Sequence, residues 1–392
     1  MIWRNKSLRI CRIYNILPIF VGKITLFMDK HSMNIFHIIS NKEWGGGEQT
    51  VLDLSRRQIA DGIHIELFCL PLESIAERFH ELNVPIHTLP LKGVLDFWSA
   101  WKMAKIIKQK QNCIVHAHNF KEAFTAAYAR KLSGRKDIRV VMCRNLTRKG
   151  KTSWIYNWLY GQLDCIVFDS QLAMDTFLST HPAIDKKKLL VIHNGIVVPT
   201  NIVPVDVKTM FSIPKDYVLA MYHGRLNPEK GLDVLIEAVE MLRDKPFRLV
   251  LVGRGTDEYT AHLQSLIEEK QLKDKVTLAG FRNPVLSYVA AANIGILPSI
   301  VPEGCSLSAQ EHLSQGHPII ATNNGGQREY INSGKNGLLV PPNDAKALAD
   351  AMGQLIDNPA LRIRLGKQAK EDFEGHMTYE HFYAKMSAIY QP

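Results

Sequence analysis

The sequence lacks the patterns that mark a disulfide framework, a metal-binding finger or a membrane span. Its six cysteines include no C-x-x-C pair, so neither a zinc site nor a set of disulfides is indicated, and a reducing compartment is expected. No run of 18 uncharged apolar residues occurs, so no segment stands out as a membrane-spanning helix. These absences lead us to expect a cytoplasmic protein.

The length and the charge balance narrow the class further. A chain of 392 residues exceeds one ordinary domain, and two domains are expected. Hydrophobic residues make up 46% and charged residues 22%, which argues against a disordered or fibrous chain. The formal net charge of +10 suggests an anionic partner, which at this stage is nucleic acid, a phosphorylated substrate or a membrane surface.

Residues 1–32 differ from the rest of the chain. They hold six basic residues and one acidic residue, and their apolar middle is interrupted by Asn15, Pro18 and Lys23. One interpretation is a signal peptide or a weak membrane anchor. We favour the other, a basic, poorly structured or membrane-associated extension before a fold that begins at Met33. The segment has no small-residue cleavage site and no unbroken apolar core.

From residue 33 onward, short apolar runs alternate with helical patterns, which predicts β-α-β units and parallel sheets. A stretch at 195–214 has three prolines and no clear period, and reads as a linker. We therefore expect an α/β fold of two doubly wound Rossmann-like domains that face a central cleft. The first would be 33–198, joined by a C-terminal helix at 376–392, and the second 199–375. The predicted strands are 35–39, 63–70, 113–116, 139–143, 165–168, 189–192, 218–223, 248–252, 276–279, 294–297, 319–321 and 338–340.

The strongest local signal follows the strand at 218–223. The segment H-G-R-L-N-P-E-K-G at 223–231 places a glycine turn and two basic residues between a strand and a helix start. Gly224 permits close backbone approach, Arg225 offers bidentate hydrogen bonds to a phosphate, and Lys230 adds a point charge. With the positive end of the next helix, these residues predict an anion site. A solvated basic turn is the alternative.

Two carboxylates eight residues apart follow the strand at 294–297. Glu303 is expected in a loop that faces a ligand, and Glu311 one to two turns into a helix that begins near Ser306. The helix start would offer backbone N–H groups to an anion. Glu311 could accept hydrogen bonds from a pair of sugar hydroxyls, and a surface carboxylate is the alternative. The expected N–H donors are Gly304, Cys305, Ser306 and Leu307.

The first half carries two further candidates. Three glycines at 45–47 read as a loop before a helix and allow a ligand to approach the backbone, but their spacing matches neither a dinucleotide fingerprint nor a P-loop. His116 ends the strand at 113–116 and His118 follows just beyond it, and a metal there would need a third ligand that the motif does not supply. We expect His118 to be a hydrogen-bonding site residue. His116 stays open between the site and a satisfied core histidine.

In this order, the segments resemble the family 4 retaining glycosyltransferases, or glycosyl transferases group 1, which have the glycosyltransferase-B fold. The resemblance extends from about residue 33 to the C-terminus. The residues that carry it are G-G-G-E at 45–48, H-A-H at 116–118, H-N-G at 193–195, G-R-L-N-P-E-K-G at 224–231, V-G-R-G at 252–255, G-F at 280–281, the pair Glu303 and Glu311, and G-G-Q-R-E at 325–329.

The resemblance implies a nucleotide-diphospho-sugar donor held mainly by the second domain. By that resemblance Arg225 and Lys230 would grip the diphosphate. Glu303 would contact hydroxyls of the donor sugar, and Glu311 would bind the ribose. The further positions that the resemblance assigns are Arg254, Phe281 and Arg282 near the base, Gly46 and Gly47 beside the phosphates and the acceptor, and His118 at the donor sugar. The chain departs from the family pattern at Cys305 and at His312, which leaves the donor undetermined.

The implied chemistry is transfer of a sugar to a glycan or lipid-linked acceptor with retention of configuration, in cell-surface polysaccharide or lipopolysaccharide assembly. No D-x-D occurs, so no metal cofactor is expected, and the basic pair would stabilise the leaving diphosphate. One alternative is a hydrolase or epimerase that acts on nucleotide sugars. The other is a nucleic-acid-binding protein, for which the sequence has no recognition motif.

The positive charge is unevenly distributed. Residues 92–151 hold fifteen basic and three acidic residues, whereas the chain outside 1–32 and 92–151 is acidic overall. Lysines at helical spacing just after three aromatic residues suit a surface that contacts an anionic membrane, and a solvated lysine face is the alternative. These residues are Phe97, Trp98, Trp101, Lys102, Lys105 and Lys108. The distribution points to a membrane or an acceptor beside the cleft rather than to nucleic acid. It leaves open peripheral contact with the inner face of the cytoplasmic membrane.

Overall fold

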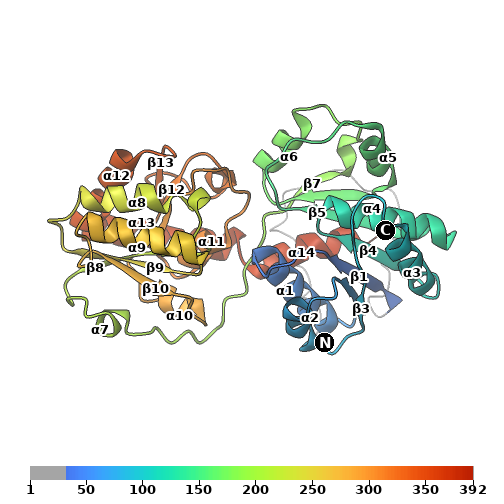
Figure 1. Ribbon diagram of the computed structural model, residues 1–392, viewed down its shortest axis with the longest axis horizontal. Helices are drawn as coiled ribbons and strands as arrows, with labels where there is room; N and C mark the ends of the chain where they lie inside the picture. The colour runs from blue at the N-terminus through green and yellow to red at the C-terminus, as the bar shows by residue number, and fades with distance from the viewer. Residues whose placement is uncertain (1–31, 392) are drawn as a thin grey trace, which may run out of the picture.

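The computed structural model describes residues 32–391, which form two α/β domains side by side (Figure 1). Residues 1–31 and 392 lie outside the described part, and so does the extension predicted at 1–32, apart from Ser32. Each domain has one parallel sheet with helices on both faces. This architecture confirms the predicted α/β fold with two Rossmann-like sheets.

The first sheet has seven parallel strands in the order β3-β2-β1-β4-β5-β6-β7. One buried cluster lies between the sheet and α3, α4, α5 and α6, and a second lies between the sheet and α1, α2 and α14. The elements are β1 (Asn34–Ile39), α1 (Gly46–Ala60), β2 (His64–Cys69), α2 (Glu73–His80), β3 (Ile86–Thr88), α3 (Phe97–Ile107), β4 (Cys113–Ala117), α4 (Phe120–Ser133), β5 (Arg139–Arg144), α5 (Trp154–Gln162), β6 (Cys165–Phe168), α6 (Gln171–Leu178) and β7 (Leu189–Val191).

The second sheet has six parallel strands in the order β10-β9-β8-β11-β12-β13. Its largest buried cluster lies under α8, α9 and α12. The elements are α7 (Val207–Met210), β8 (Val218–His223), α8 (Leu232–Glu240), β9 (Phe247–Val252), α9 (Asp257–Glu269), β10 (Val276–Gly280), α10 (Val285–Val289), β11 (Ile294–Leu297), α11 (Leu307–Ser314), β12 (Ile319–Thr322), β13 (Gly337–Val340), α12 (Ala345–Asp357) and α13 (Pro359–His376). The chain then ends in α14 (Tyr379–Tyr390), which packs on the first domain.

In both sheets the strand order reverses between the first strand and the fourth. The reversal lies between β1 and β4 in the first sheet and between β8 and β11 in the second. In open parallel sheets a ligand crevice forms outside the carboxyl ends of the strands at this switch point. The segments that follow β1, β4, β8 and β11 are therefore the places to look for a site.

The structure corrects three local predictions. Helix α1 begins at Gly46, so Gly46 and Gly47 lie in its first turn and not in a loop; the Glu48 carboxylate accepts the N–H of Gly45 at 2.9 Å and fixes this start. Strand β3 and helix α2 were not predicted, because β3 has only three residues and none is fully buried. The predicted linker contains the short helix α7.

Helix α14 runs back from the second domain and packs on the first (Figure 1). Its tyrosines anchor it through their hydroxyls. Tyr379 Oη donates to the Asp53 carbonyl at 2.7 Å, and Tyr383 Oη donates to Asp61 Oδ2 at 2.9 Å. The last residue of the helix, Tyr390, is 1% exposed and reaches the centre of the first sheet. The C-terminal helix thus belongs physically to the first domain's core.

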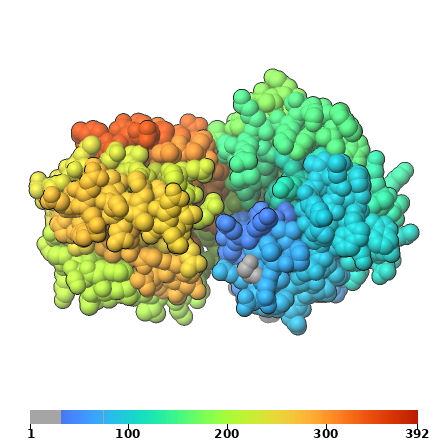
Figure 2. Space-filling view, in the orientation of Figure 1, coloured from blue at the N-terminus to red at the C-terminus, as the bar shows by residue number. Residues whose placement is uncertain are grey.

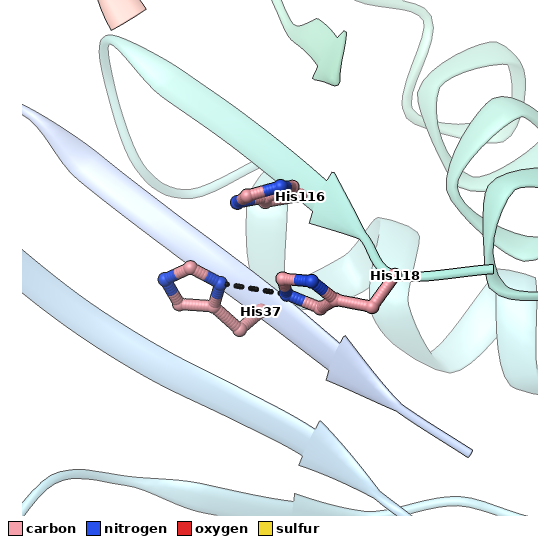
Figure 3. A group of neighbouring side chains, drawn as sticks. All are labelled: His37, His116 and His118. Carbon is pink, nitrogen blue, oxygen red and sulfur yellow. Dashed lines mark hydrogen bonds between the residues drawn. The ribbon is translucent and has the colours of Figure 1, made fainter. Parts of the chain in front are cut away.

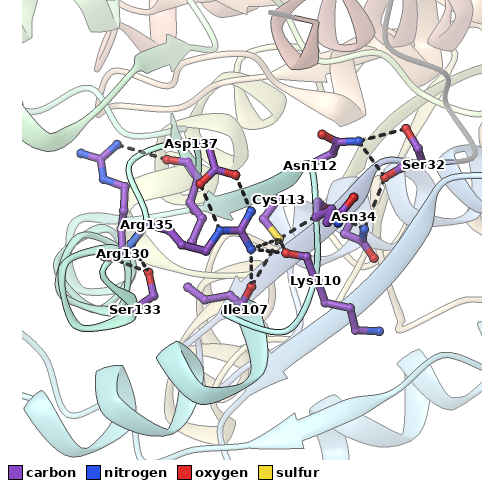
Figure 4. Close-up of polar contacts among 12 residues, drawn as sticks. Ser32, Asn34, Ile107, Lys110, Asn112, Cys113, Arg130, Ser133, Arg135 and Asp137 are labelled. Atoms are coloured by element: carbon purple, nitrogen blue, oxygen red, sulfur yellow. Dashed lines mark hydrogen bonds and ion pairs between the residues drawn. The ribbon is translucent and has the colours of Figure 1, made fainter.

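Arginines hold the end of the first sheet that lies away from the crevice (Figure 4). Arg135 donates to the Ile107 carbonyl at 3.1 Å and to Asp137 Oδ1 at 3.0 Å, and Arg130 Nη1 lies 3.0 Å from Asp164 Oδ2. Some of the basic residues in 92–151 therefore form hydrogen bonds and ion pairs within the first domain.

Candidate functional site

Lys230 and Glu303 meet at the switch point of the second sheet. Lys230 ends a short 3-10 turn after β8, where Asn227 Oδ1 accepts its N–H at 3.2 Å. Its Nζ lies 2.9 Å from Glu303 Oε1 in the loop after β11, and the Ser299 hydroxyl donates to the same carboxylate. Both charged side chains are largely shielded, at 19% and 16% exposure. The structure therefore brings together a cation and a carboxylate that are far apart in the sequence.

Glycines shape the loop that carries Arg225 and Lys230. Gly253 has a φ of +156°, and a Cβ there would lie 1.8 Å from the Gly224 carbonyl oxygen. Gly231 has a φ of +69°, and its Cβ would lie 2.1 Å from the Pro298 carbonyl oxygen. Neither position accepts a side chain, because both the backbone angle and the space favour glycine. This close packing fixes the path of the loop and leaves Arg225 exposed at the cleft.

Glu311 lies in α11, as predicted, and contacts His223. The Glu311 carboxylate makes a short hydrogen bond with Nε2 of His223, the last residue of β8. The His223 ring is 6% exposed and lies 5.1 Å from the ring of His312. Sequence reasoning missed this partner, because His223 was seen only as the residue before the glycine turn.

The start of α11 differs from the prediction. The Cys305 N–H donates to Asp169 Oδ2 at 3.2 Å, and the Ser306 N–H donates to Tyr330 Oη at 3.2 Å. The expectation that these two N–H groups are offered to an anion is therefore wrong for this structure. Ser306 is instead the N-cap, since its hydroxyl accepts the N–H of Ala309. Of the other two expected donors, Gly304 lies against Asp169 and Leu307 lies against Gly46 of the first domain.

The three residues expected near a base lie after β9 and β10. Arg254 is exposed, and its carbonyl accepts the N–H of Leu226 at 2.8 Å. Phe281 is 64% exposed, and the Arg282 guanidinium lies 5.9 Å from the ring centres of Phe211 and Tyr288. Arg282 thus packs on aromatic rings of the second domain, to which it also belongs.

A cavity of about 530 Å³ lies at the carboxyl end of the first sheet and opens toward the furrow between the two halves of the molecule (Figure 2). Gly46, Gly47 and His118 of the first domain line it together with Arg225 of the second. The buried guanidinium of Arg144 lines it as well. The structure therefore brings predicted residues of both domains to one space.

Three histidines cluster beside this cavity (Figure 3). His37 in β1 lies opposite His116 in β4, and His37 Nδ1 lies 3.1 Å from Nε2 of His118, just beyond β4. His116 is 0% exposed and contacts Tyr390 and Cys143, so it is a satisfied core histidine. Burial lowers the pKa of His37 to about 4 and lowers those of His116 and His118 well below 6.5. All three rings are therefore neutral at pH 7.

Glu122 is a functional candidate that sequence reasoning missed. Its carboxylate is 1% exposed and accepts hydrogen bonds from the N–H of Ser40, the N–H of His118 and the side chain of Asn119. Burial raises the pKa of Glu122 to about 7, although these hydrogen bonds lower it. Glu122 ties the loop after β1 to the loop after β4 and so positions His118. In the sequence it was only one of three acids in a basic stretch.

At the interface, a carboxylate of each domain accepts hydrogen bonds from the other domain. Glu329 accepts the N–H groups of Gln171 and Leu172 at the start of α6, at 2.8 and 2.9 Å, and lies 2.8 Å from His193 Nε2. Asp169, just before α6, is 4% exposed and contacts the loop before α11. The cleft is thus built on direct contacts between the α6 and α11 regions.

Family comparisons match both halves of the chain. Residues 44–198 match the model described as Glycosyltransferase Family 4, and residues 208–372 match the model described as Glycosyl transferases group 1. Putative glycosyltransferase EpsD of Bacillus subtilis is 34% identical over 40% of each chain. A putative colanic acid biosynthesis glycosyltransferase, WcaL of Salmonella typhimurium, is 34% identical over 38% of this chain and 40% of its own. The chain thus aligns with less than half of each of these two relatives.

Solved structures match over almost the whole chain. A glycosyltransferase from Rickettsia africae has a TM-score of 0.80 at 19% identity, covering 92% of this chain and 98% of its own. Anabaena HepE in complex with UDP has a TM-score of 0.78 at 18% identity, covering 91% and 99%. At these identities the likeness shows the fold. Because the two family models together extend from residue 44 to residue 372, and the fold is that of the same enzymes, the chain belongs to the group 1 glycosyltransferases with the glycosyltransferase-B fold.

Proposed function

We propose that this chain transfers a sugar from a nucleotide-diphospho-sugar to a glycan or lipid-linked acceptor, in the assembly of a cell-surface polysaccharide or lipopolysaccharide. The observation that carries the proposal is that Arg225, beside the Lys230–Glu303 pair, lines the same cavity as His118. A donor gripped from the second domain would thus meet groups of the first. The colanic acid relative and the UDP complex of HepE support the same substrate classes.

In this proposal Arg225 and Lys230 stabilise the diphosphate as it leaves. Both are cations beyond the carboxyl ends of the strands at the switch point. Such cations stabilise a developing negative charge strongly where closure of a cleft excludes water. Lys230 is already oriented by Glu303 at 2.9 Å, so little reorganisation is needed when the phosphate arrives. Glu303 would then hold the hydroxyls of the donor sugar, and Glu311, oriented by His223, would hold the ribose.

We propose that the reaction needs no metal ion and retains the anomeric configuration. The basic pair takes the place of a cation at the diphosphate. The departing phosphate would accept the proton of the attacking hydroxyl on the same face of the sugar. Activity should persist in excess chelator, and NMR of the product should show the anomeric configuration of the donor. Loss of activity in chelator, or an inverted product, would contradict this part.

Donor binding tests the assignment directly. In a thermal-shift screen with a panel of nucleotide sugars, a ligand at 100 times its Kd stabilises the protein by about 2.7 kcal/mol. Arg225→Ala should remove the shift, and Lys230→Ala should weaken binding by roughly 10- to 100-fold, because each loses a charge-assisted hydrogen bond. Arg243→Ala, at an exposed arginine of the same domain, is the matched control and should respond as the wild type does. A full response of the Arg225 variant would refute the clamp.

Analysis of the reaction products separates transfer from the alternative chemistry. With acceptor glycan or lipid present, transfer yields an extended acceptor. A hydrolase would release free sugar from the donor alone, and an epimerase would convert one nucleotide sugar to another. Either product, formed without an acceptor, would contradict the proposed transfer and favour the hydrolase or the epimerase.

We further propose that α3 and the loop before it contact an anionic membrane, with the enzyme in the cytoplasm at the inner face of the cytoplasmic membrane. Large apolar side chains and lysines share this surface: Leu95, Phe97, Trp98, Trp101, Lys102, Lys105 and Lys108. Leu95 is 73% exposed, and Lys105 Nζ lies 3.6 Å from the centre of the Trp101 ring. Within residues 32–391, no helix has the length and apolar character needed to span a bilayer.

Vesicle co-sedimentation tests this surface. Binding is expected to vesicles with anionic phosphatidylglycerol and to fall with salt, because the lysines supply part of the attraction. Trp98→Ala with Lys105→Glu should abolish it. Lys367→Glu, an equal charge change at an exposed lysine of α13, is the control and should bind as the wild type does. Equal binding of the α3 variant and the control would refute the assignment.

A further inference from the structure

Three histidine rings converge at the switch point of the first sheet, and we propose that they form a binding site for a divalent transition-metal ion such as Zn²⁺. His37 and His116 are register partners on neighbouring parallel strands. His118 follows two residues later, so its side chain returns to the same face of the sheet as that of His116. One ring nitrogen from each histidine lies within 4.8 Å of the others. Figure 3 shows the three rings facing one another.

The spacing is close to that of a tetrahedral site. Zinc–nitrogen bonds are about 2.0–2.1 Å, so two nitrogens on one ion lie about 3.3 Å apart. His37 Nδ1 and His118 Nε2 are 3.1 Å apart, and the His116 and His118 ring centres are 4.3 Å apart. The widest nitrogen separation is no more than 4.8 Å, so it must shrink by at most about 1.5 Å. His118 is half-buried at the cavity and can make this movement, whereas His37 and His116 are fixed in strands.

Outer partners hold the two buried rings in place. Gln58 Oε1 lies 2.9 Å from His37 Nε2; when it accepts that N–H, the lone pair of His37 is left on Nδ1, which faces His118. Both ring nitrogens of His116 have a partner, with Tyr390 Oη 2.9 Å from Nδ1 and Cys143 Sγ 3.0 Å from Nε2. One of these contacts must therefore break when His116 binds the ion, and the other stays as the outer partner. Metal-binding histidines usually have such a partner on the second ring nitrogen.

The donor set indicates the class of ion. Neutral imidazoles suit Zn²⁺, Co²⁺, Ni²⁺ and Cu²⁺, whereas Mg²⁺ and Ca²⁺ prefer oxygen ligands. Three histidines with an open fourth position are also the ligand set of a well-known class of zinc enzymes. Here the fourth position would face the cavity of about 530 Å³ that His118 lines, which gives the ion and one water access. The sequence motif offered only two ligands, and His37 supplies the third from a strand far upstream in the chain.

The ion would not take part in sugar transfer. Resting on the proposed function, we expect it to inhibit, because an ion on His118 Nε2 withdraws that ring from the donor sugar. Zn²⁺ should therefore lower the transfer rate, and a chelator should restore it. Through this cluster, free transition-metal ions would inhibit a reaction that itself requires no metal ion.

Cobalt spectroscopy tests the site without using activity. The tag-free full-length chain, stripped with chelator, is titrated with Co²⁺ while the visible absorption that marks four-coordinate cobalt is followed. We expect one Co²⁺ per chain, displaced by Zn²⁺. His37→Gln should abolish the absorption, and Gln58→Ala should weaken binding by roughly 10- to 100-fold, as loss of an outer partner does. His317→Gln, at a partly buried histidine of the other domain, is the matched control and should match the wild type.

The outcomes separate the site from the proposed function. Circular dichroism shows whether His37→Gln is folded; if it is not, His118→Gln at the cavity takes its place. Absence of four-coordinate absorption in the folded wild type, or its persistence in the histidine variant, overturns the metal site. Cobalt binding in a chain that transfers no sugar from any donor tested would overturn the proposed function and leave the site standing.

Discussion

Replacing Asp169 by asparagine should stabilise the protein at pH 8 and change nothing at pH 4. Asp169 is 4% exposed between the two domains, and its carboxylate accepts the Cys305 N–H at 3.2 Å and the Ser170 hydroxyl at 3.3 Å. Burial raises its pKa from 3.8 to about 6, despite these hydrogen bonds. Because the folded chain holds this proton more tightly than the unfolded chain, the side chain's contribution to stability is complete below about pH 4 and is lost as the pH rises through about 6.

The expected size follows from the shift of about two pKa units, which corresponds to a free-energy penalty on the order of 3 kcal/mol once the carboxylate is ionised. The asparagine side chain would keep the shape without the charge, since its Oδ1 can accept the Cys305 N–H while its amide N–H donates to the Ser170 hydroxyl. Thermal unfolding of the two proteins from pH 4 to pH 8 should therefore show melting temperatures that coincide at pH 4. They should separate by several degrees at pH 8, with the variant higher. A difference that does not change with pH, or a variant that is less stable at pH 8, would refute the reasoning.

Three further predictions concern the same framework. Gly253→Ala should lower the free energy of unfolding in urea by about 3 kcal/mol or more, because its Cβ would lie 1.8 Å from a backbone carbonyl oxygen at a φ of +156°. Tyr390→Phe should cost about 1–2 kcal/mol in the same assay, since the buried hydroxyl is 2.9 Å from His116 Nδ1. The pKa of Glu329 is shifted in the opposite direction from that of Asp169. Burial raises it, but hydrogen bonds from His193 and from the start of α6 outweigh burial and hold the pKa below 4.5. The stability that wild type has over Glu329→Gln should thus be present at pH 7 and fade as the pH falls below 4.5, measured by thermal unfolding.

Most of the fold could be predicted from the sequence, because buried parallel strands appear as short apolar runs. The strands at 218–223 and 294–297 were placed at their observed bounds, and the C-terminal helix predicted at 376–392 is observed at 379–390. Strand β3 and helix α2 were not predicted, because many of their residues are partly or fully exposed and their hydrophobic pattern is weaker. The start of α1 was misplaced because three glycines read as a loop, although a carboxylate three residues into the helix caps it.

The site was only partly predictable, because its key contacts join residues far apart in the sequence. Lys230 and Glu303 were each expected near a ligand, but their 2.9 Å contact depends on β8 and β11 being neighbours in the sheet. His37 gave no signal, since a single histidine in an apolar strand is usually a core residue. It is the register between β1 and β4 that places it beside His116.

The start of α11 shows the limit of reading a helix N-terminus as an anion site. Local sequence shows that backbone N–H groups are there, but not whether another part of the chain has taken them. Here Asp169 and Tyr330, which are 136 and 24 residues away from their partners, occupy the N–H groups of Cys305 and Ser306. An anion that used the Cys305 N–H would have to displace a buried carboxylate of like charge, and one that used the Ser306 N–H would have to displace the Tyr330 hydroxyl. Lys230 does contact the Glu303 carboxylate, but its ammonium has three donors and can keep Glu303 on one side while a phosphate binds on another. Arg225 is exposed at the cleft. We therefore propose that these two side chains, rather than the start of the helix, bind the diphosphate.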